Sequence, residues 1–416
     1  MIHFDAAEEQ HPHVTIKVVG VGGAGGNTIN SMIEADSPHS IEFIAINTDE
    51  QALHTSQAHT KIQIGLKSTK GLGTGANQEL GKRAAEEDLD KIIDAIKDAD
   101  IVFLTAGMGG GTGSGALPVI TRSLKEHNIL SIATITKPFL FEGKRRAQVA
   151  EDAIALMKDC VDTLIVIPNQ KLLDVAEANL SMIDAFAMIN NVLTQSIKGV
   201  SDIITKPGHI NVDFADVRAI MKDKGLAVIG SGRASGENRA EQATLAAISS
   251  PLLETMDIDG AHDVLMNITG GTSLGLHEIS TAASILYQKA DEHAHIILGS
   301  VIDKTMEDEI IVTVIATGFD PHRQPSTHTS ASLSKKHPET DANTTQTSVQ
   351  PTCSTDSPEA ADISQSLSND SKPITTIASQ STSTLILNEE KNSYNCPLDV
   401  PSYLRKQKND STPTTQ

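Results

Sequence analysis

Hydrophobic and polar positions divide the chain into a globular part and a polar tail. Between residues 14 and 179, short apolar runs alternate with longer segments of helical character, and the runs occupy residues 14–19, 41–46, 101–105, 129–135 and 163–167. Each of the last four runs follows a helix-like segment. This alternation predicts a Rossmann-type α/β domain, in which a parallel sheet carries helices on both faces.

One long amphipathic segment comes next. Apolar side chains recur at helical spacing through residues 181–205, and Pro207 and Gly208 end the pattern. We expect a single helix here that joins two lobes. Beyond it, the pattern predicts an α+β lobe with helices near residues 214–222, 239–249 and 277–289. Its strands are expected near residues 227–229, 264–268, 296–301 and 310–316.

The composition changes abruptly after the second lobe. Of the 70 residues from 321 to 390, 26 are Ser or Thr and none is aromatic. Such a segment buries too little apolar surface to offset its ordering entropy, so we expect a disordered linker. A short apolar island follows, with Leu398, Pro401, Tyr403 and Leu404. A terminal island of this kind indicates a docking segment, although a chance apolar cluster is the alternative.

Composition and charge narrow the class of protein. The formal net charge of -20 disfavours binding to nucleic acid and broad adhesion to anionic membranes. The three cysteines, Cys160, Cys353 and Cys396, are too far apart to suggest a disulfide framework, which fits a reducing compartment. The N-terminus shows no secretory signal, and no apolar run approaches the roughly 20 residues that span a bilayer. A cytoplasmic protein without membrane insertion is expected.

Two glycine-rich loops carry the candidate chemistry. The first, GVGGAGGN at residues 20–27, follows a predicted strand and precedes a predicted helix. Glycines there let backbone N–H groups approach phosphate oxygens, and the helix adds its positive end. A tight strand-to-helix turn would explain the same pattern.

The second loop is more informative. Six of the nine residues from 107 to 115 are glycine, which is costly in conformational entropy unless the backbone must wrap a ligand. Thr112 and Ser114 add hydroxyl groups. Neither loop contains Lys, so the pattern is not of the Walker type, and amides, helix ends and hydroxyls would hold phosphates instead. A third glycine-rich stretch, residues 70–77, either closes this site from the side or is a plain surface loop.

At this point the sequence resembles the tubulin/FtsZ family. The second loop contains GGGTGSG at residues 109–115, similar to the family signature, and further FtsZ-like motifs follow in the right order. They are NTD at 47–49, KGLG at 70–73, KPF at 137–139 with FEG at 141–143, IPN at 167–169, NVDFAD at 211–216 and LDVPSYLRKQ at 398–407.

The resemblance implies a GTP site and names its residues. The phosphates of GTP or GDP would be held by Gly22, Gly23, Ala24, Gly25, Gly26 and Asn27 and by Gly109, Gly110, Gly111, Thr112 and Gly113. Glu142 and Arg146 match positions that contact the ribose and the nearby phosphate region. Asn169 lies at a matching nucleotide-contacting position, and Phe186 matches the residue beside the guanine ring. Asn190 matches the base reader, where many relatives carry Asp.

The resemblance also assigns a catalytic role to Asn211, Asp213 and Asp216. In this family the loop 211–216 of one subunit completes the GTPase site of the next, with water and Mg²⁺ between the carboxylates and the γ-phosphate. From spacing alone, helix capping by Asn or Asp is the simpler interpretation. No metal site built from protein side chains alone is expected.

The implied organisation has six parts: a flexible N-terminus (1–13), a GTP-binding domain (14–180), a connecting helix (181–206), a GTPase-activating domain (207–319), a linker (320–392) and a partner-binding tail (393–416). The implied function is a GTPase that polymerises head to tail and forms the bacterial division ring at mid-cell. The segment that begins at Leu398 and ends at Gln407 resembles the peptide that binds the membrane tethers FtsA and ZipA.

Two other functions are compatible with parts of the sequence. An NAD-dependent oxidoreductase would explain the G-x-G-x-x-G of the first loop but leaves the second loop and the Asp pair without a role. A filament scaffold that binds GTP without turnover would explain both loops but not Asp213 and Asp216.

Overall fold

The computed structural model describes residues 14–35, 40–175, 180–206, 208, 210–250 and 260–319. The expected flexible N-terminus, linker and partner-binding tail lie outside the described residues. Within them, the strands are β1 (Ile16–Val21), β2 (Ile41–Asn47), β3 (Thr60–Gln63), β4 (Ile101–Gly107), β5 (Leu130–Lys137), β6 (Thr163–Pro168), β7 (Gly225–Ser235), β8 (Asp263–Gly270), β9 (His295–Ile302) and β10 (Glu309–Thr317).

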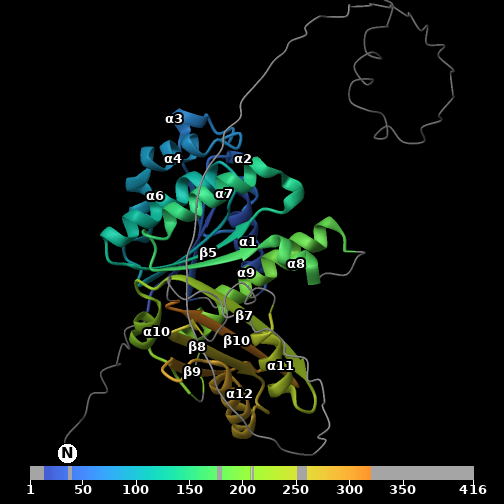
Figure 1. Cartoon of the computed structure of the whole chain (residues 1–416). Coiled ribbons are helices and arrows are strands. Elements are labelled where there is room, and N and C mark those ends of the chain that lie inside the picture. The colour runs from blue at the N-terminus through green and yellow to red at the C-terminus, as the bar shows by residue number, and fades with distance from the viewer. Residues whose placement is uncertain are drawn as a thin grey trace, which may run out of the picture. The chain divides into compact units, whose positions relative to one another are not determined.

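Helices cover both lobes (Figure 1). They are α1 (Gly22–Glu34), α2 (Glu50–Thr55), α3 (Leu66–Thr69), α4 (Gln78–Glu87), α5 (Leu89–Ile96), α6 (Thr112–Glu126), the 3₁₀ turn η1 (Leu140–Glu142), α7 (Lys144–Met157), α8 (Asn169–Val175), α9 (Met182–Thr205), α10 (Phe214–Met221), α11 (Arg239–Ile248) and α12 (Leu276–Lys289). None of these helices is long and apolar enough to cross a bilayer.

The strands of the described part form one sheet in the order β3-β2-β1-β4-β5-β6-β7-β10-β8-β9. From β3 to the start of β7 every pair is parallel, as the alternating pattern predicts. Antiparallel pairing begins where β10 joins β7 and β8. The predicted α/β fold with a second α+β lobe is therefore confirmed.

The first lobe buries both faces of its sheet. Ile16 and Val18 of β1 belong to a core shared with α1 and α9, whereas Val19 and Val21 belong to a core shared with α4, α5, α6 and α7. All six residues of β1 are buried, and its sequence is apolar apart from Lys17, whose ammonium group pairs with Glu42 and Asp98. The carboxyl ends of these parallel strands, from which the glycine loops depart, lie along one edge of the sheet.

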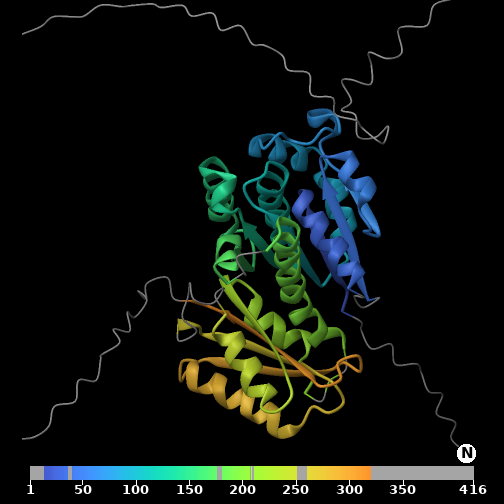
Figure 2. The same cartoon turned by 90° about the vertical axis from the view of Figure 1, so that its right-hand side faces the viewer.

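Helix α9 lies between the two lobes (Figure 2). Its buried residues include Leu193 and Ile197, and the same core contains residues of β5 and β6 from the first lobe and of α10 from the second. Gly199 permits close approach to the second lobe, since a Cβ there would lie 2.7 Å from Cγ2 of Thr313 on β10. The expected connecting helix is present with nearly the expected ends.

One strand is much longer than the sequence pattern predicts. We expect a strand at residues 227–229, but β7 runs from Gly225 to Ser235 because its start pairs with β6 and its remainder with β10. Gly232 interrupts the apolar run, and the reason is tertiary: a Cβ there would lie 2.0 Å from the carbonyl oxygen of Ala243 on α11.

Candidate nucleotide site

A cavity of about 460 Å³ opens at the carboxyl ends of β1, β4 and β5. Its volume falls within the roughly 300–1,000 Å³ of small-molecule sites. Thirteen of the residues expected to bind nucleotide line it: Gly22, Gly23, Ala24, Asn27, Gly110, Gly111, Thr112, Gly113, Glu142, Arg146, Asn169, Phe186 and Asn190. Residues from β1 to α9 therefore converge on one place.

The N-termini of two helices line this cavity. Helix α1 begins at Gly22, so the first glycine loop is the first turn of that helix, and α6 begins at Thr112. Neither helix has an acidic residue in its first turn, a feature they share with α3, α7 and α8, whereas the other α-helices each have one. Exposed N–H groups and positive helix ends without a carboxylate to neutralise them favour a phosphate-bearing ligand.

The phosphate-facing end of the cavity is held by hydroxyl groups. Oγ1 of Thr112 lies 2.7 Å from Oγ1 of Thr48 and 3.4 Å from Oγ1 of Thr74, and all three side chains are buried. The N–H of Gly109 donates to Oγ of Ser114 at 2.8 Å, which closes the second glycine loop on itself. Thr74 lines the cavity, so of the two interpretations of residues 70–77 the one that closes the site from the side fits the geometry.

The opposite end of the cavity is aromatic and amide-rich. Phe186 meets Phe139 edge to face at 5.7 Å, and Phe139 stacks on Phe141 at 4.9 Å. Asn169 is buried, and its Oδ1 has no hydrogen-bond partner within the described residues. A buried acceptor without a partner is costly, so a donor supplied by a ligand would satisfy it. Together with Asn190, it suits the polar edge of a heterocycle stacked near Phe186.

Glu142 and Arg146 form the rim between these two ends. Nη1 of Arg146 lies 2.6 Å from Oε2 of Glu142, and Oε1 of Glu142 accepts from the N–H of Phe139 at 2.9 Å. Among the described residues that line the cavity, Glu142 is the only carboxylate, and this pairing compensates its charge.

Three expected nucleotide-binding glycines do not line the cavity, and two of them have a packing role. A Cβ on Gly25 would lie 2.4 Å from the carbonyl oxygen of Thr105, so this glycine lets α1 approach β4. Gly109 has a φ of +93° and lies against the backbone of Arg146. A Cβ on Gly26 would meet nothing within 4 Å.

Several lining residues were not among the expected site residues, namely Val21, Thr74, Gly107, Met108, Thr136, Pro138, Ile189 and Leu193. Most are apolar or small and belong to strand ends or to the buried face of α9. Five of them lie in loops or motifs that the sequence singles out: Val21 in the first loop, Gly107 and Met108 in the second loop, Thr74 in the third glycine-rich stretch, and Pro138 in the KPF motif.

The proposed catalytic residues lie elsewhere. Asp213 is the N-cap of α10, and its Oδ1 accepts from the N–H of Asp216 at 2.8 Å. Oδ1 of Asn211 accepts from the N–H of Gly208 at 2.8 Å. All three side chains are exposed, none lines the cavity, and within the described residues neither carboxylate has an ion-pair partner. The capping interpretation is thus correct for Asp213, and it leaves Oδ2 available.

This geometry defines a nucleotide-binding α/β protein whose phosphate site is built from backbone amides and hydroxyls. Comparison with known families identifies it further. Residues 15–177 match the GTPase domain of the Tubulin/FtsZ family, and residues 225–320 match the C-terminal domain of the FtsZ family. The chain belongs to the Tubulin/FtsZ family and is a GTPase that binds GTP and GDP.

Solved structures agree with this assignment. An empty FtsZ dimer from M. jannaschii is 42% identical, with a TM-score of 0.71; the match covers 74% of this chain and 89% of that one. CetZ1 from Haloferax volcanii, a GDP-bound monomer, is 22% identical over 74% of this chain and 95% of that chain, with a TM-score of 0.65. CetZ2 from the same organism, a protofilament bound to GTPγS, is 20% identical over 74% and 94%, with a TM-score of 0.64. The CetZ likenesses concern the fold alone.

Proposed function

We propose that this GTPase polymerises head to tail, hydrolyses GTP at the contact between subunits and forms the cytokinetic ring of a dividing bacterial cell. The main support for the proposal is that the nucleotide cavity and the candidate catalytic carboxylates lie at separate places. In this proposal the cavity binds the triphosphate, but its described lining residues offer no unpaired carboxylate. Asp213 and Asp216 are exposed, lie outside the cavity and have no ion-pair partner within the described residues.

The rim of the cavity supports a subunit contact at this place. Large hydrophobic side chains are exposed on three segments that border it, namely the loop before α4 (Leu72), η1 (Leu140 and Phe141) and the first turn of α9 (Met182 and Ile183). Leu72 is 84% exposed and Ile183 81%. Exposed apolar side chains gathered around a polar cavity mark an interaction surface. A neighbouring subunit that covered this rim would also exclude water from the nucleotide.

Hydrolysis would then depend on the carboxylates and the phosphate that meet at the contact between subunits. A carboxylate from Asp213 or Asp216 of the next subunit would accept a hydrogen bond from the attacking water and draw its proton away, while Asn211 orients the same water. The γ-phosphate stays fixed by the amides of the two glycine loops and by Thr112. Two carboxylates would repel the phosphate unless a cation lies between them.

Mg²⁺ is that cation in our proposal. It prefers carboxylate, hydroxyl and phosphate oxygens, and usually binds one or two carboxylates together with the phosphates of its substrate. Asp213 and Asp216 of the neighbouring subunit and the hydroxyl of Thr112 supply such oxygens. Bound there, the ion would neutralise the charge that develops on the phosphate oxygens.

The remaining expectations concern partners and place. The segment from Leu398 to Gln407 would bind membrane tethers such as FtsA and ZipA, and the protein would work in the cytoplasm at the mid-cell division site. Removal of this segment should leave polymerisation intact and abolish tether binding in a pull-down assay.

The deciding experiment follows light scattering and phosphate release together as the protein concentration is raised. With GTP, turnover per subunit should be near zero in dilute monomeric protein and rise with scattering, because a monomer lacks the second half of its site. ATP and GDP should produce neither signal beyond background. Equal turnover per subunit in monomeric and polymerised protein would contradict the proposal.

A further inference from the structure

Helix α6 connects the nucleotide cavity to the helix that carries the proposed catalytic aspartates. It has 15 residues and is therefore about 22 Å long. Thr112, in its first turn, lines the cavity. Asn128, two residues after its last turn, has a φ of +56° and lies at the boundary with α10.

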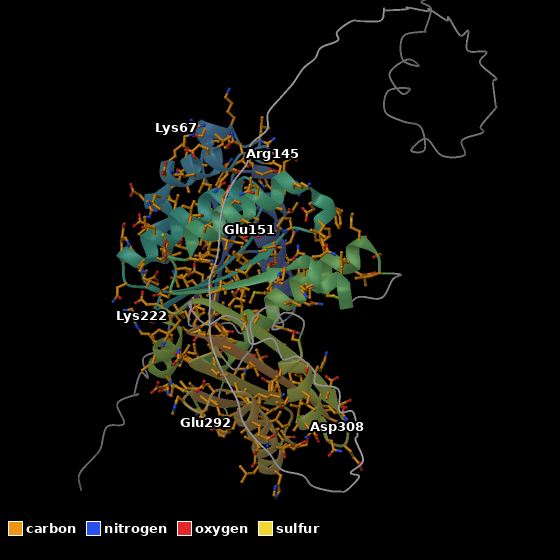
Figure 3. The ribbon with its side chains drawn as sticks, viewed as in Figure 1. Lys67, Arg145, Glu151, Lys222, Glu292 and Asp308 are labelled. Carbon is orange, nitrogen blue, oxygen red and sulfur yellow. The ribbon has the colours of Figure 1, made fainter. Side chains whose placement is uncertain are left out.

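The far end of α6 meets α10 through polar contacts. Nζ of Lys222 donates to Oδ1 of Asn128 at 2.9 Å, and Nη2 of Arg218 donates to the backbone oxygen of Asn128 at 3.4 Å. Nζ of Lys125 lies 3.3 Å from Oδ1 of Asp223. We call these five residues the α6–α10 contact. Lys222 is labelled between the two lobes in Figure 3.

The rest of α10 is held in other directions. Val217, Ile220 and Met221 are buried in the core shared by the lobes, which fixes the distance of the helix from the sheet. Hydroxyl groups of Thr317 and Thr163 donate to the backbone oxygens of Ile220 and Met221. These contacts hold α10 against the sheet, whereas the α6–α10 contact, which is exposed to solvent, is the set of polar contacts that joins its C-terminal end to the end of α6.

Small movements of α10 would matter at its other end. The helix has eight residues and is about 12 Å long, and Asp213 and Asp216 lie at its N-terminus. A tilt at Lys222 is therefore transmitted to the two carboxylates. Misplacement of a reacting group by about 1 Å can lower a rate on the order of a hundredfold.

We propose that Asn128 is a positioning residue for GTP hydrolysis: through Lys222 and Arg218 it sets the placement of the Asp213–Asp216 turn relative to α6. The inference rests on the proposed function, in which these aspartates act on the nucleotide of the next subunit. A single helix, α6, then links the phosphate loop of one site to the groups presented to another.

The positive φ of Asn128 allows a clean separation of backbone and side-chain effects. Gly, Asn and Asp all tolerate this conformation better than other residues. Asn128→Gly keeps the backbone and removes the acceptor for Lys222, whereas Asn128→Asp keeps an acceptor. On the other side of the contact, Lys222→Met removes the donor and Lys222→Arg retains one.

The experiment measures GTP affinity, KM, kcat in polymerised protein and the melting temperature of the full-length chain. Asn128→Gly and Lys222→Met should each lower kcat roughly tenfold, with GTP affinity and KM within twofold of wild type. The double variant should be no slower than either single variant, since both remove one contact. Asn128→Asp and Lys222→Arg should stay within twofold of wild type. Lys289→Met is the matched control, since Lys289 ends α12 in the same lobe and makes no ion pair within the described residues.

The outcomes separate the inference from the proposed function. Asp216→Ala is measured in parallel. If Asp216→Ala abolishes turnover while Asn128→Gly keeps the wild-type kcat, the positioning role is wrong and the proposed function stands. If Asp216→Ala also keeps the wild-type kcat, the proposed function itself fails. A lower melting temperature with unchanged kcat would show that the contact is merely structural and would overturn the inference.

Discussion

The nucleotide cavity and the segment 211–216 differ in what each lacks. The cavity has amide donors and two positive helix ends, but the one carboxylate among its described lining residues, Glu142, is paired with Arg146. The segment 211–216 has two carboxylates without ion-pair partners in the described residues, but it lines no cavity. Binding can thus be built into one subunit, while hydrolysis in our proposal needs two. In that proposal the separation would couple turnover to assembly.

The sharpest test of this division removes a carboxylate. Asp216→Ala should lower phosphate release in polymerised protein by about a hundredfold or more, the range expected for loss of a general base. GTP affinity, measured by filter binding on dilute protein, should stay within twofold of wild type because Asp216 is outside the cavity. If GTP affinity fell in parallel, Asp216 would contribute to nucleotide binding, and the separation between the cavity and the segment 211–216 would be wrong.

The converse test disturbs the cavity. Gly25→Ala should push α1 away from β4, because the new Cβ would lie 2.4 Å from the carbonyl oxygen of Thr105. Overpacking of this kind costs about 1–3 kcal/mol, and we expect GTP affinity to fall about tenfold.

Gly26→Ala is the matched control for that change. A Cβ there meets nothing within 4 Å, so this variant should bind GTP normally and gain about 0.5–1 kcal/mol of stability as a helical alanine. Equal affinities for the two variants, measured by titration calorimetry, would refute the assignment of Gly25 to helix–sheet packing.

A smaller effect is expected at the base. Asn190→Asp should raise the preference for GTP over ITP about tenfold, since a carboxylate accepts from both N1–H and the 2-amino group of guanine, and ITP lacks that amino group. Asn191→Asp introduces the same charge one residue away, outside the cavity lining. Competition binding with GTP and ITP measures the preference of each variant. If only Asn191→Asp changed this preference, Asn191 and not Asn190 would be the residue that recognises the base.

The smallest effect on activity is expected in the second lobe, at a partly buried ion pair. Arg239 is 5% exposed and donates to Glu278 at 2.7 and 3.0 Å, and this guanidinium lowers the pKa of Glu278. A carboxylate with a lowered pKa contributes stability above its unfolded value of about 4.3 and loses it as pH falls through its folded pKa. Glu278→Gln should therefore weaken the protein at pH 7 and flatten the dependence of its unfolding free energy on pH below about 5.

Urea unfolding at several pH values measures that dependence, and GTP affinity at pH 7 should not change. An unchanged acid dependence would mean that other carboxylates dominate it. A change in GTP affinity would show that this ion pair in the second lobe influences the nucleotide cavity. That result would contradict the separation between the cavity and the second lobe.

The elements with strong periodicity were predictable. The apolar periodicity that predicts burial is clear in the sequence of β1, β2, β4, β5 and β6 and of helix α9. Where the pattern is weak, prediction was incomplete. Strand β7 was expected at three residues because Gly230, Ser231 and Gly232 break the apolar run, and only the contact with α11 explains Gly232.

The candidate site shows the same limit. The composition of the glycine loops indicates a phosphate site, and the family resemblance assigns its residues. Composition does not say which glycines line the cavity, and Gly25 and Gly109 lie outside the lining, where they serve backbone packing and turn geometry. Thr48, which fixes Thr112 from the end of β2, belongs to a family motif, but its hydrogen bond is visible only in the structure.

The sequence by itself determined the sheet, the two glycine loops, the acidic turn at 211–216 and the order in which they occur. It could do so because neighbouring residues encode backbone preference and burial. The tertiary structure decided which of these features meet. Parallel strand ends bring the two loops and the start of α9 to one cavity, while α10 stays outside it, tied to the far end of α6. Distances between segments far apart in the chain depend on packing of the whole core, and no local pattern encodes them.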